Sequence, residues 1–209
     1  MKKIYLVRHG RQDTELFNED ASLSSIGRKQ AELLRDRLKG IHFDKIYSST
    51  LKRAIETSDI LNENWHMDIE RRKELCEIDY GLLTGKLISS ADNENKDFFD
   101  RLNSRKEDLA FPNGENGEMA YNRAKIVFKE IEENPYESIL IVCHGGLIRS
   151  LICGLLSLPF SSRLALSKYL ENTSISYLLY DEKKKLYYLE SINDHTHLLP
   201  YKDLLRNKS

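Results

Sequence analysis

Histidine follows an apolar run at two places in this sequence. Residues 4–7 (Ile-Tyr-Leu-Val) lead into Arg8 and His9, and residues 139–143 (Ile-Leu-Ile-Val-Cys) lead into His144. Each run has the near-continuous hydrophobicity of a central strand that is buried on both faces. Open α/β sheets keep their ligand sites at the C-terminal ends of such strands. Two strands that bring histidine to one sheet edge are hard to explain by packing alone.

Two further charged side chains are expected at the same edge. Arg53 lies at the start of the helix that follows the second predicted strand, and Glu77 lies at the beginning of a polar insertion. Either residue alone would be read as a solvated surface charge. Two arginines and two histidines around one point, however, form a strong anion site, because guanidinium groups match phosphate oxygens and remain charged at any working pH.

The elements that would position these residues alternate between strands and helices. Ser24 is a suitable N-cap for the first helix, and Gly40 suits its C-terminal end. This alternation predicts an α/β fold, a three-layer sandwich with a mostly parallel central sheet and helices on both faces. The expected strands are 4–7, 43–47, 67–70, 139–143, 174–180 and 186–192, the last two as a hairpin, and the expected helices are 25–39, 51–62, 118–133 and 147–156.

Residues 74–111 interrupt this alternation with glycine, serine and a strongly polar run. We interpret them as a helical insertion over the C-terminal edge of the sheet, with one helix near 97–109. Substrate choice is expected to depend on residues 86–111. The chain contains no internal repeat and no linker rich in Gly, Ser or Pro, so residues 1–209 are expected to form a single domain.

Composition limits the classes of partner. The chain has 209 residues, of which 40% are hydrophobic and 31% charged, with a formal net charge of −1. This balance argues against a nucleic-acid partner, and no apolar run is long enough to span a membrane. Cys76, Cys143 and Cys153 are interpreted as reduced structural cysteines in a cytoplasmic protein, with no secretory signal before the first strand.

Several stretches in order along the chain resemble motifs of the histidine phosphatase superfamily, the family that includes cofactor-dependent phosphoglycerate mutases. The resemblance covers nearly the whole chain. The matching stretches are 6–10 (Leu-Val-Arg-His-Gly), 23–31 (Leu-Ser-x-x-Gly-x-x-Gln-Ala), 48–57 (with Arg-Ala-x-x-Thr at its end), 77–81 (the acid loop), 112–115 (Pro-Asn-Gly-Glu) and 142–146 (with the second His-Gly).

The resemblance implies a metal-independent phosphatase that uses no cofactor. His9 would attack phosphorus and become a phosphohistidine, and Arg8 and Arg53 would keep it unprotonated. With His144, these arginines would hold the equatorial oxygens of the phosphoryl group. Glu77 would give a proton to the leaving group and later take one from water. The expected partner is a small phosphorylated metabolite.

The phosphate pocket departs from the family pattern at two positions. Glu15 stands where the family usually has Asn, and Gln12 replaces the usual Thr or Ser. We expect Glu15 to turn outward, where it could pair with Arg11, because a carboxylate inside the pocket would repel the substrate. The residues expected to bind substrate are Gly10, Gln12, Asn18, Ser22 and Gly145.

Two alternative functions remain open at this point. One is a phosphoglycerate mutase, although the insertion lacks the adjacent arginine pair that mutases use for the substrate carboxylate; Arg71 and Arg72 are expected at a strand end instead. The other is a non-catalytic phosphate-binding module. The pair His195 and His197 suggests a zinc site, but no Cys or carboxylate cluster completes one.

Overall fold

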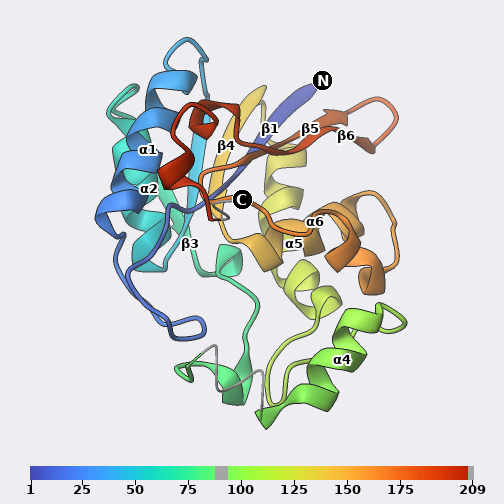
Figure 1. Cartoon of the computed structure of the whole chain (residues 1–209). Helices are drawn as coiled ribbons and strands as arrows, with labels where there is room; N and C mark the ends of the chain where they lie inside the picture. The colour runs from blue at the N-terminus through green and yellow to red at the C-terminus, as the bar shows by residue number, and fades with distance from the viewer. Residues whose placement is uncertain (88–93, 207–209) are drawn as a thin grey trace.

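A computed structural model describes residues 1–87 and 94–206 of the chain. Its centre is a six-stranded sheet with the order β3-β2-β4-β1-β5-β6 (Figure 1). The first four strands run parallel, and the β5–β6 hairpin adds two strands at one edge, with β5 antiparallel to β1. The strands are β1 (Lys2–Arg8), β2 (Lys45–Ser49), β3 (Ile69–Arg72), β4 (Ser138–Cys143), β5 (Ile175–Asp181) and β6 (Leu186–Asp194).

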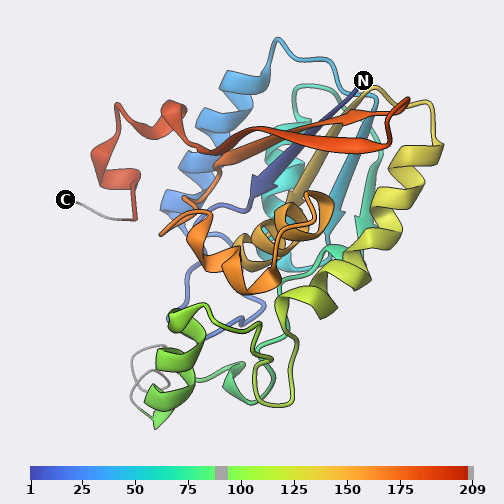
Figure 2. The same ribbon diagram turned by 90° about the vertical axis from the view of Figure 1, so that its right-hand side faces the viewer.

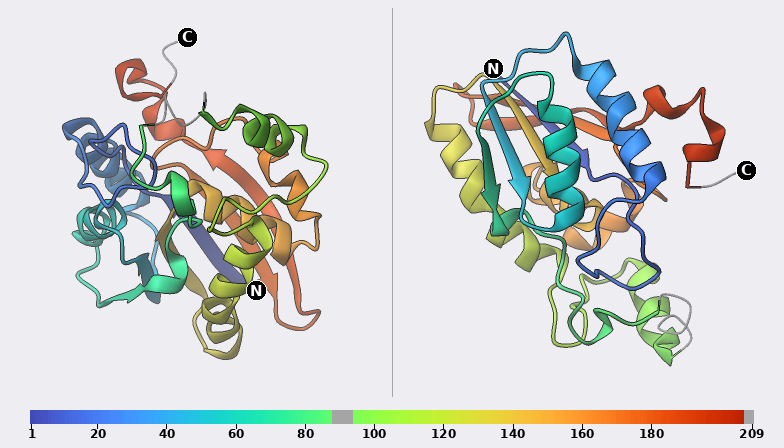
Figure 3. Two further views of the ribbon diagram at one scale, coloured as in Figure 1. Left: turned by 90° about the horizontal axis from the view of Figure 1, so that it is seen from below. Right: turned by 90° about the vertical axis from the view of Figure 1, so that its left-hand side faces the viewer.

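Helices cover both faces of this sheet. One pair packs on one face and another pair on the opposite face, as the two side views show (Figures 2 and 3). A further helix of the described residues belongs to the insertion. The helices are α1 (Ser25–Leu38) and α2 (Lys52–Asn62) on the first face, α5 (Gly117–Glu133) and α6 (Gly145–Leu155) on the second, and α4 (Lys96–Ser104) in the insertion.

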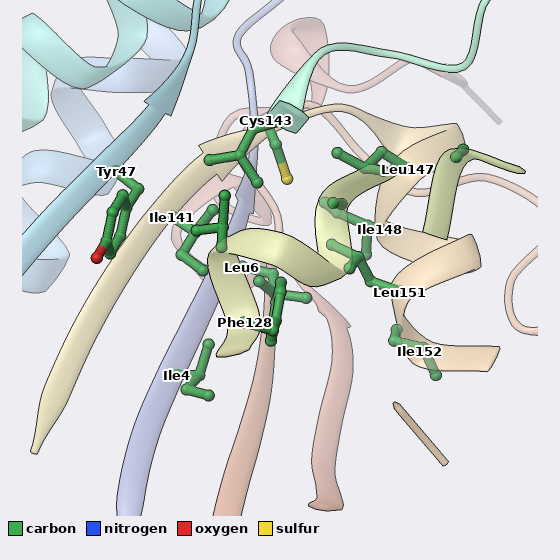
Figure 4. Close-up of a cluster of buried hydrophobic side chains, with 14 of the residues drawn as sticks. Ile4, Leu6, Tyr47, Phe128, Ile141, Cys143, Leu147, Ile148, Leu151 and Ile152 are labelled. Carbon is green, nitrogen blue, oxygen red and sulfur yellow. The ribbon is translucent and has the colours of Figure 1, made fainter. Parts of the chain in front are cut away.

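Alternation of side chains along the central strands builds the two cores. In β1, Ile4 and Leu6 point toward α5 and α6, while Val7 belongs to the cluster under α1 and α2. Figure 4 shows the first cluster, in which Leu6 and Phe128 lie between the strand residue Ile141 and the side chains of α6. A strand that is buried on both sides reads as continuously apolar, which explains the runs in the sequence.

The register of the two central strands places the histidines. Arg8 at the end of β1 pairs with Cys143 at the end of β4. His9 and His144 therefore leave adjacent strands at the same edge of the sheet. The insertion, drawn in green, lies beyond this edge (Figure 2). The predicted fold class is confirmed, although residues 88–93 of the predicted covering segment lie outside the described residues.

Several predicted boundaries were wrong by two to five residues. Strand β2 begins at Lys45 and not at residue 43, because the Asp44 carboxylate accepts the backbone N–H of Ser138 at 2.9 Å and joins the chain to β4 just before the ladder starts. Strand β3 begins at Ile69, since the side chain of Asn62 holds the backbone of Met67.

The insertion helix shows the largest of these errors. It runs from Lys96 to Ser104, whereas the sequence predicted 97–109. Arg105 adopts a left-handed backbone conformation with φ 58°, and this ends the helix. The helix is anchored by Leu102, which joins the core under α5 and α6.

Helix α1 approaches the loop after His9 very closely. Ser24 caps the helix as predicted, with its side chain accepting a hydrogen bond from the N–H of Gly27. A Cβ atom at Gly27 would lie 2.0 Å from the carbonyl oxygen of Arg11, and one at Gly10 would lie 2.5 Å from the carbonyl oxygen of Gly27. Glycine is therefore required on both sides of this contact.

We expect Gly27→Ala to lower the free energy of unfolding by about 1–3 kcal/mol, the usual cost of forcing an extra methyl group into a packed site. Gly40→Ala is the matched control, because a Cβ at Gly40 meets nothing within 4 Å, and it should change stability by no more than ~0.5 kcal/mol. Urea unfolding of the two variants tests this, and equal stabilities would contradict the close contact.

Candidate active site

His9 and His144 lie side by side in the interior. Their ring centroids are 5.0 Å apart, and the side chains are 4% and 0% exposed. Both follow parallel strands whose ends are adjacent in the sheet. The structure thus brings together the two histidines that the apolar runs of the sequence suggested.

The tautomer of His9 follows from its hydrogen bond. Its Nδ1 lies 2.7 Å from the carbonyl oxygen of Gly10. A carbonyl oxygen can only accept, so Nδ1 carries the proton and Nε2 of the neutral ring is left with a free lone pair. The N–H of Gly10 donates to Thr57 Oγ1 at 3.0 Å, and Asn172 Nδ2 donates to the His9 carbonyl oxygen at 2.9 Å. These two hydrogen bonds fix the backbone of His9 and Gly10, and thereby the position of the His9 ring.

Burial is the largest cause that lowers the pKa of His9 well below its ordinary value of 6.5. The positive charges of Arg53 and Arg8 lower that pKa further. Desolvation penalises the charged imidazolium, and nearby cations repel it. His9 is therefore neutral at neutral pH, with a nitrogen able to act as a nucleophile.

The two arginines are fixed by backbone and amide acceptors. Arg53 is 2% exposed, and its Nη2 donates to Asn18 Oδ1 at 2.7 Å. Arg8 donates through Nη1 to the carbonyl oxygen of Leu170. The Nε atoms of both arginines are buried and have no hydrogen-bond partner among the described residues. Burial and the charge of Arg206 lower the pKa of Arg8 to about 9, so it still carries a positive charge at neutral pH.

Glu77 is held at the N-terminus of α6. Its Oε1 accepts the backbone N–H of Ile78 and of Leu147, each at 2.9 Å, and its Oε2 accepts the N–H of Gly146 at 3.1 Å. Helix N-termini stabilise anions in this way. A Cβ atom at Gly146 would come within 2.6 Å of Glu77 Oε1, so the glycine permits this approach.

His144 has one ring nitrogen engaged and one unengaged. Its Nε2 lies 2.8 Å from Ser49 Oγ, while Nδ1 is buried without a hydrogen-bond partner among the described residues. Burial, followed by the charge of Arg53, lowers the pKa of His144 well below 6.5. The ring is therefore neutral, like that of His9.

The loop that carries Glu77 is fastened by an arginine that the sequence analysis did not identify. Arg123 on α5 donates to the carbonyl oxygens of Glu74, Cys76 and Glu77 and also binds the carboxylate of Glu115 at 2.8 Å. The carboxylate of Glu115 in turn accepts the N–H of Asp79 at 3.0 Å. Within this network, Arg123 fixes the backbone that presents Glu77.

A cavity of about 560 Å³ opens onto these groups. Of the predicted site residues, Arg8, His9, Arg53, Glu77, Gln12, Asn18 and Gly145 line it. His144 and Gly10 are buried and are not among the lining residues, and Ser22 is exposed and does not line the cavity either.

Glu15 is exposed and does not line the cavity, as the outward orientation requires. Arg11, its suggested partner, donates instead to the carbonyl oxygen of Leu204 at 3.0 Å. The departure from the family pattern therefore introduces no carboxylate into the cavity wall at this position.

Several lining residues escaped the sequence analysis. Arg149 was the most detectable, because it is the one charged residue in the predicted helix 147–156. Asn172, Lys168 and Arg206 lie in segments without a recognisable motif. Only the tertiary fold brings these three residues to the cavity.

Other candidate chemistries find little support in the geometry. Among the residues that the structure describes, no group of three or more His, Cys, Asp or Glu side chains could hold a metal ion. His195 Nδ1 binds the carbonyl oxygen of Asn193, and His197 Nε2 lies 3.1 Å from Thr173 Oγ1. Cys143 is fully buried, which raises the pKa of its thiol. Within residues 1–87 and 94–206, no helix is long and apolar enough to cross a membrane.

The family model for the histidine phosphatase superfamily (branch 1) matches residues 4–195. The chain belongs to this superfamily. The match spans both His-Gly strand ends, the acid loop and the helix with Arg53, so the predicted resemblance is confirmed.

Similar proteins carry phosphatase and mutase names. Phosphoserine phosphatase 1 of Hydrogenobacter thermophilus is 28% identical over 89% of this chain and 90% of its own length. A probable phosphoglycerate mutase of Salmonella choleraesuis is 29% identical over 95% of both chains. The structure of a mycobacterial glucosyl-3-phosphoglycerate phosphatase in complex with inorganic phosphate has a TM-score of 0.83 and 25% identity, covering 94% of this chain and 99% of the other.

The family and these phosphatase relatives support the predicted enzyme class, a phosphoric monoester hydrolase, and that prediction is confirmed. Mutase-named relatives appear as well, so the family likeness alone leaves the substrate open.

We expect the imidazole of His9 to stay neutral well below pH 6.5 in an NMR pH titration of the free enzyme. Arg53→Gln should raise the pKa of His9, because removing a nearby positive charge makes protonation easier. Arg71→Gln is the control, since Arg71 pairs with Asp59 on the surface, and it should leave the His9 titration unchanged. A wild-type His9 that titrates at or above pH 6.5 would contradict this electrostatic account.

Proposed function

We propose that this enzyme hydrolyses a small phosphomonoester through a phosphohistidine on His9. The observation that carries the proposal is the fixed tautomer of a buried, neutral histidine inside a cavity lined by cations. With Nδ1–H bound to the Gly10 carbonyl, Nε2 is the nitrogen available for attack. Its lone pair forms the N–P bond while the P–O bond to the leaving group breaks.

Positive charge around the phosphoryl group would come from the chain itself. The buried Nε atoms of Arg8 and Arg53 and the free Nδ1 of His144 are unused by the described residues. The two guanidinium Nε–H groups can donate to phosphoryl oxygens. His144 can join them through Nδ1 when Ser49 Oγ donates to its Nε2, the tautomer that puts the single ring proton on Nδ1. Donors preorganised in a water-poor site stabilise developing charge strongly. This arrangement supports a mechanism in which no metal ion is needed.

Glu77 is the proposed acid and base. It lines the cavity, and no other Asp or Glu is found among the described lining residues. Its proton would pass to the leaving oxygen as the P–O bond breaks. A water molecule would then give a proton to the Glu77 carboxylate and attack phosphorus, which releases inorganic phosphate and regenerates the neutral His9.

The mutase alternative has weaker support. Arg72 binds Glu130 and Arg71 binds Asp59, so neither arginine is among the residues that line the cavity. They lie on β3, as predicted, and do not supply the missing arginine pair of the insertion. Hydrolysis of p-nitrophenyl phosphate compared with isomerisation of 3-phosphoglycerate would separate the two activities.

The unpaired thiols of Cys76, Cys143 and Cys153 support the proposed cytoplasmic location.

We expect His9→Ala to reduce hydrolysis by several orders of magnitude, because no other described side chain is placed for attack. Wild-type protein should take up acid-labile, alkali-stable label from substrate phosphate, and the variant should not. His42→Ala serves as the control because the His42 side chain is 85% exposed, away from the cavity. Substantial turnover or labelling of the His9→Ala protein would show that the nucleophile is a different residue.

We expect Glu77→Gln to slow substrates with poor leaving groups by about 10²–10⁴-fold and p-nitrophenyl phosphate far less. An alkoxide needs a proton as it departs, whereas an activated phenolate does not. Asp79→Asn is the matched control, since Asp79 caps the N–H of Gly81 and does not line the cavity. Equal losses on both kinds of substrate would remove the acid role from Glu77.

A further inference from the structure

The cavity holds more positive charge than one phosphoryl group beside His9 would engage. Glu77 is the acidic residue among the described lining residues. In the described part of the chain, none of the lining cations forms an ion pair within 4.0 Å with a carboxylate. The cationic lining residues are Arg8, Arg11, Arg53, Arg149, Lys168 and Arg206.

Three of these cations come from α6 and from the segments that follow it in the chain. Arg149 projects from α6, with Nη2 donating to the Ser167 carbonyl oxygen at 3.0 Å and Nε buried without a partner among the described residues. Lys168 lies on the segment that follows, with Nζ 5.4 Å from the ring centroid of Tyr169. Arg206 comes from the C-terminal segment. Their side chains reach the cavity from sequence positions far apart.

The C-terminal segment is hydrogen-bonded to α1 and to the loop that follows His9. The Leu204 carbonyl oxygen accepts hydrogen bonds from Gln30 Nε2 at 2.8 Å and from Arg11 Nη2 at 3.0 Å. The Arg206 N–H donates to the buried carboxylate of Glu171 at 3.0 Å. The segment, red in Figure 2, accordingly lies on the α1 side of the molecule. These bonds place Arg206 at the cavity.

The effect of the Arg206 charge on its neighbours agrees with a position of Arg206 at the cavity. After burial, the charge of Arg206 is the largest cause that lowers the pKa of Arg8, and it contributes to the lowered pKa of Arg149. Like charges that repel one another in a partly buried cavity are costly unless an anion neutralises them. A neutral alcohol portion of the substrate would leave that repulsion in place.

We propose that Arg149, Lys168 and Arg206 form a second anion subsite, so that the substrate is a phosphomonoester with a second anionic group, a carboxylate or a second phosphate. Guanidinium groups bind either group through paired hydrogen bonds. The inference rests on the proposed function, because it assigns the first phosphoryl group to His9. It makes the C-terminal segment part of substrate recognition.

Matched substrate pairs test the subsite. Hydrolysis of phosphoserine is compared with that of phosphoethanolamine, which lacks the carboxylate. Hydrolysis of glucose 1,6-bisphosphate is compared with that of glucose 6-phosphate, which lacks the second phosphate. The wild-type enzyme should prefer the more anionic member of at least one pair by roughly tenfold or more in kcat/KM. Arg206→Gln and Arg149→Gln should each remove most of that preference, chiefly by raising KM. Their losses on p-nitrophenyl phosphate should be at least several-fold smaller.

Lys202→Gln is the control, because Lys202 is an exposed cation in the same C-terminal segment and does not line the cavity. It should leave the preference intact. Hydrolysis without preference for the anionic member of either pair would overturn the subsite while leaving the phosphatase proposal in place. Equal losses on all substrates in Arg206→Gln would also overturn it. Absence of hydrolysis of every substrate by the wild type would instead reject the proposed function.

Discussion

The hydrogen bond between His9 Nδ1 and the Gly10 carbonyl oxygen sets the chemistry of the whole site. It fixes the ring orientation and leaves Nε2 as a lone-pair donor. Arginines that would attract a phosphate also oppose protonation of this ring, and burial opposes it more strongly. One electrostatic environment thus supports both phosphate binding and the nucleophilicity of His9. The partner of His9 Nδ1 is the neutral Gly10 carbonyl group; a carboxylate at this place would favour the protonated ring.

The fold provides this environment through adjacent strand ends. Strands β1 and β4 are neighbours, and the helix after β4 begins directly beyond His144. The backbone N–H groups at that helix start hold Glu77, which comes from a different part of the chain. The only acidic group among the described cavity residues is thereby held by backbone dipoles and is not paired with an arginine. The cations remain available to an anionic ligand.

The sequence was most informative where local patterns and packing act together. The continuous apolar runs predicted buried strands. Because His9 and His144 follow two of these strands and Arg53 begins the helix after another, all three were expected at one edge of the sheet. Boundaries failed where side chains replaced ladder hydrogen bonds, as Asp44 does before β2 and Asn62 does before β3. Residue spacing contained no signal for these contacts.

The cavity wall was less predictable than the catalytic centre. Lys168 and Arg206 come from irregular segments whose course depends on long-range contacts, such as those of Gln30 with Leu204. Ser22 was expected to bind substrate from its position in the loop alone, yet the bridge between Gln12 and Leu23 leaves it exposed outside the cavity lining. Whether a loop residue of this kind lines the cavity depends on the contacts made by the ends of the loop and not on its own residue type.

The position of the phosphoryl group on a trapped phosphoenzyme tests the central claim most directly. Protein quenched during turnover and examined by phosphorus NMR and peptide mass spectrometry should carry phosphate on Nε2 of His9, because Nδ1 is occupied by the Gly10 carbonyl oxygen. Phosphate on Nδ1 of His9, or on His144, would contradict the account.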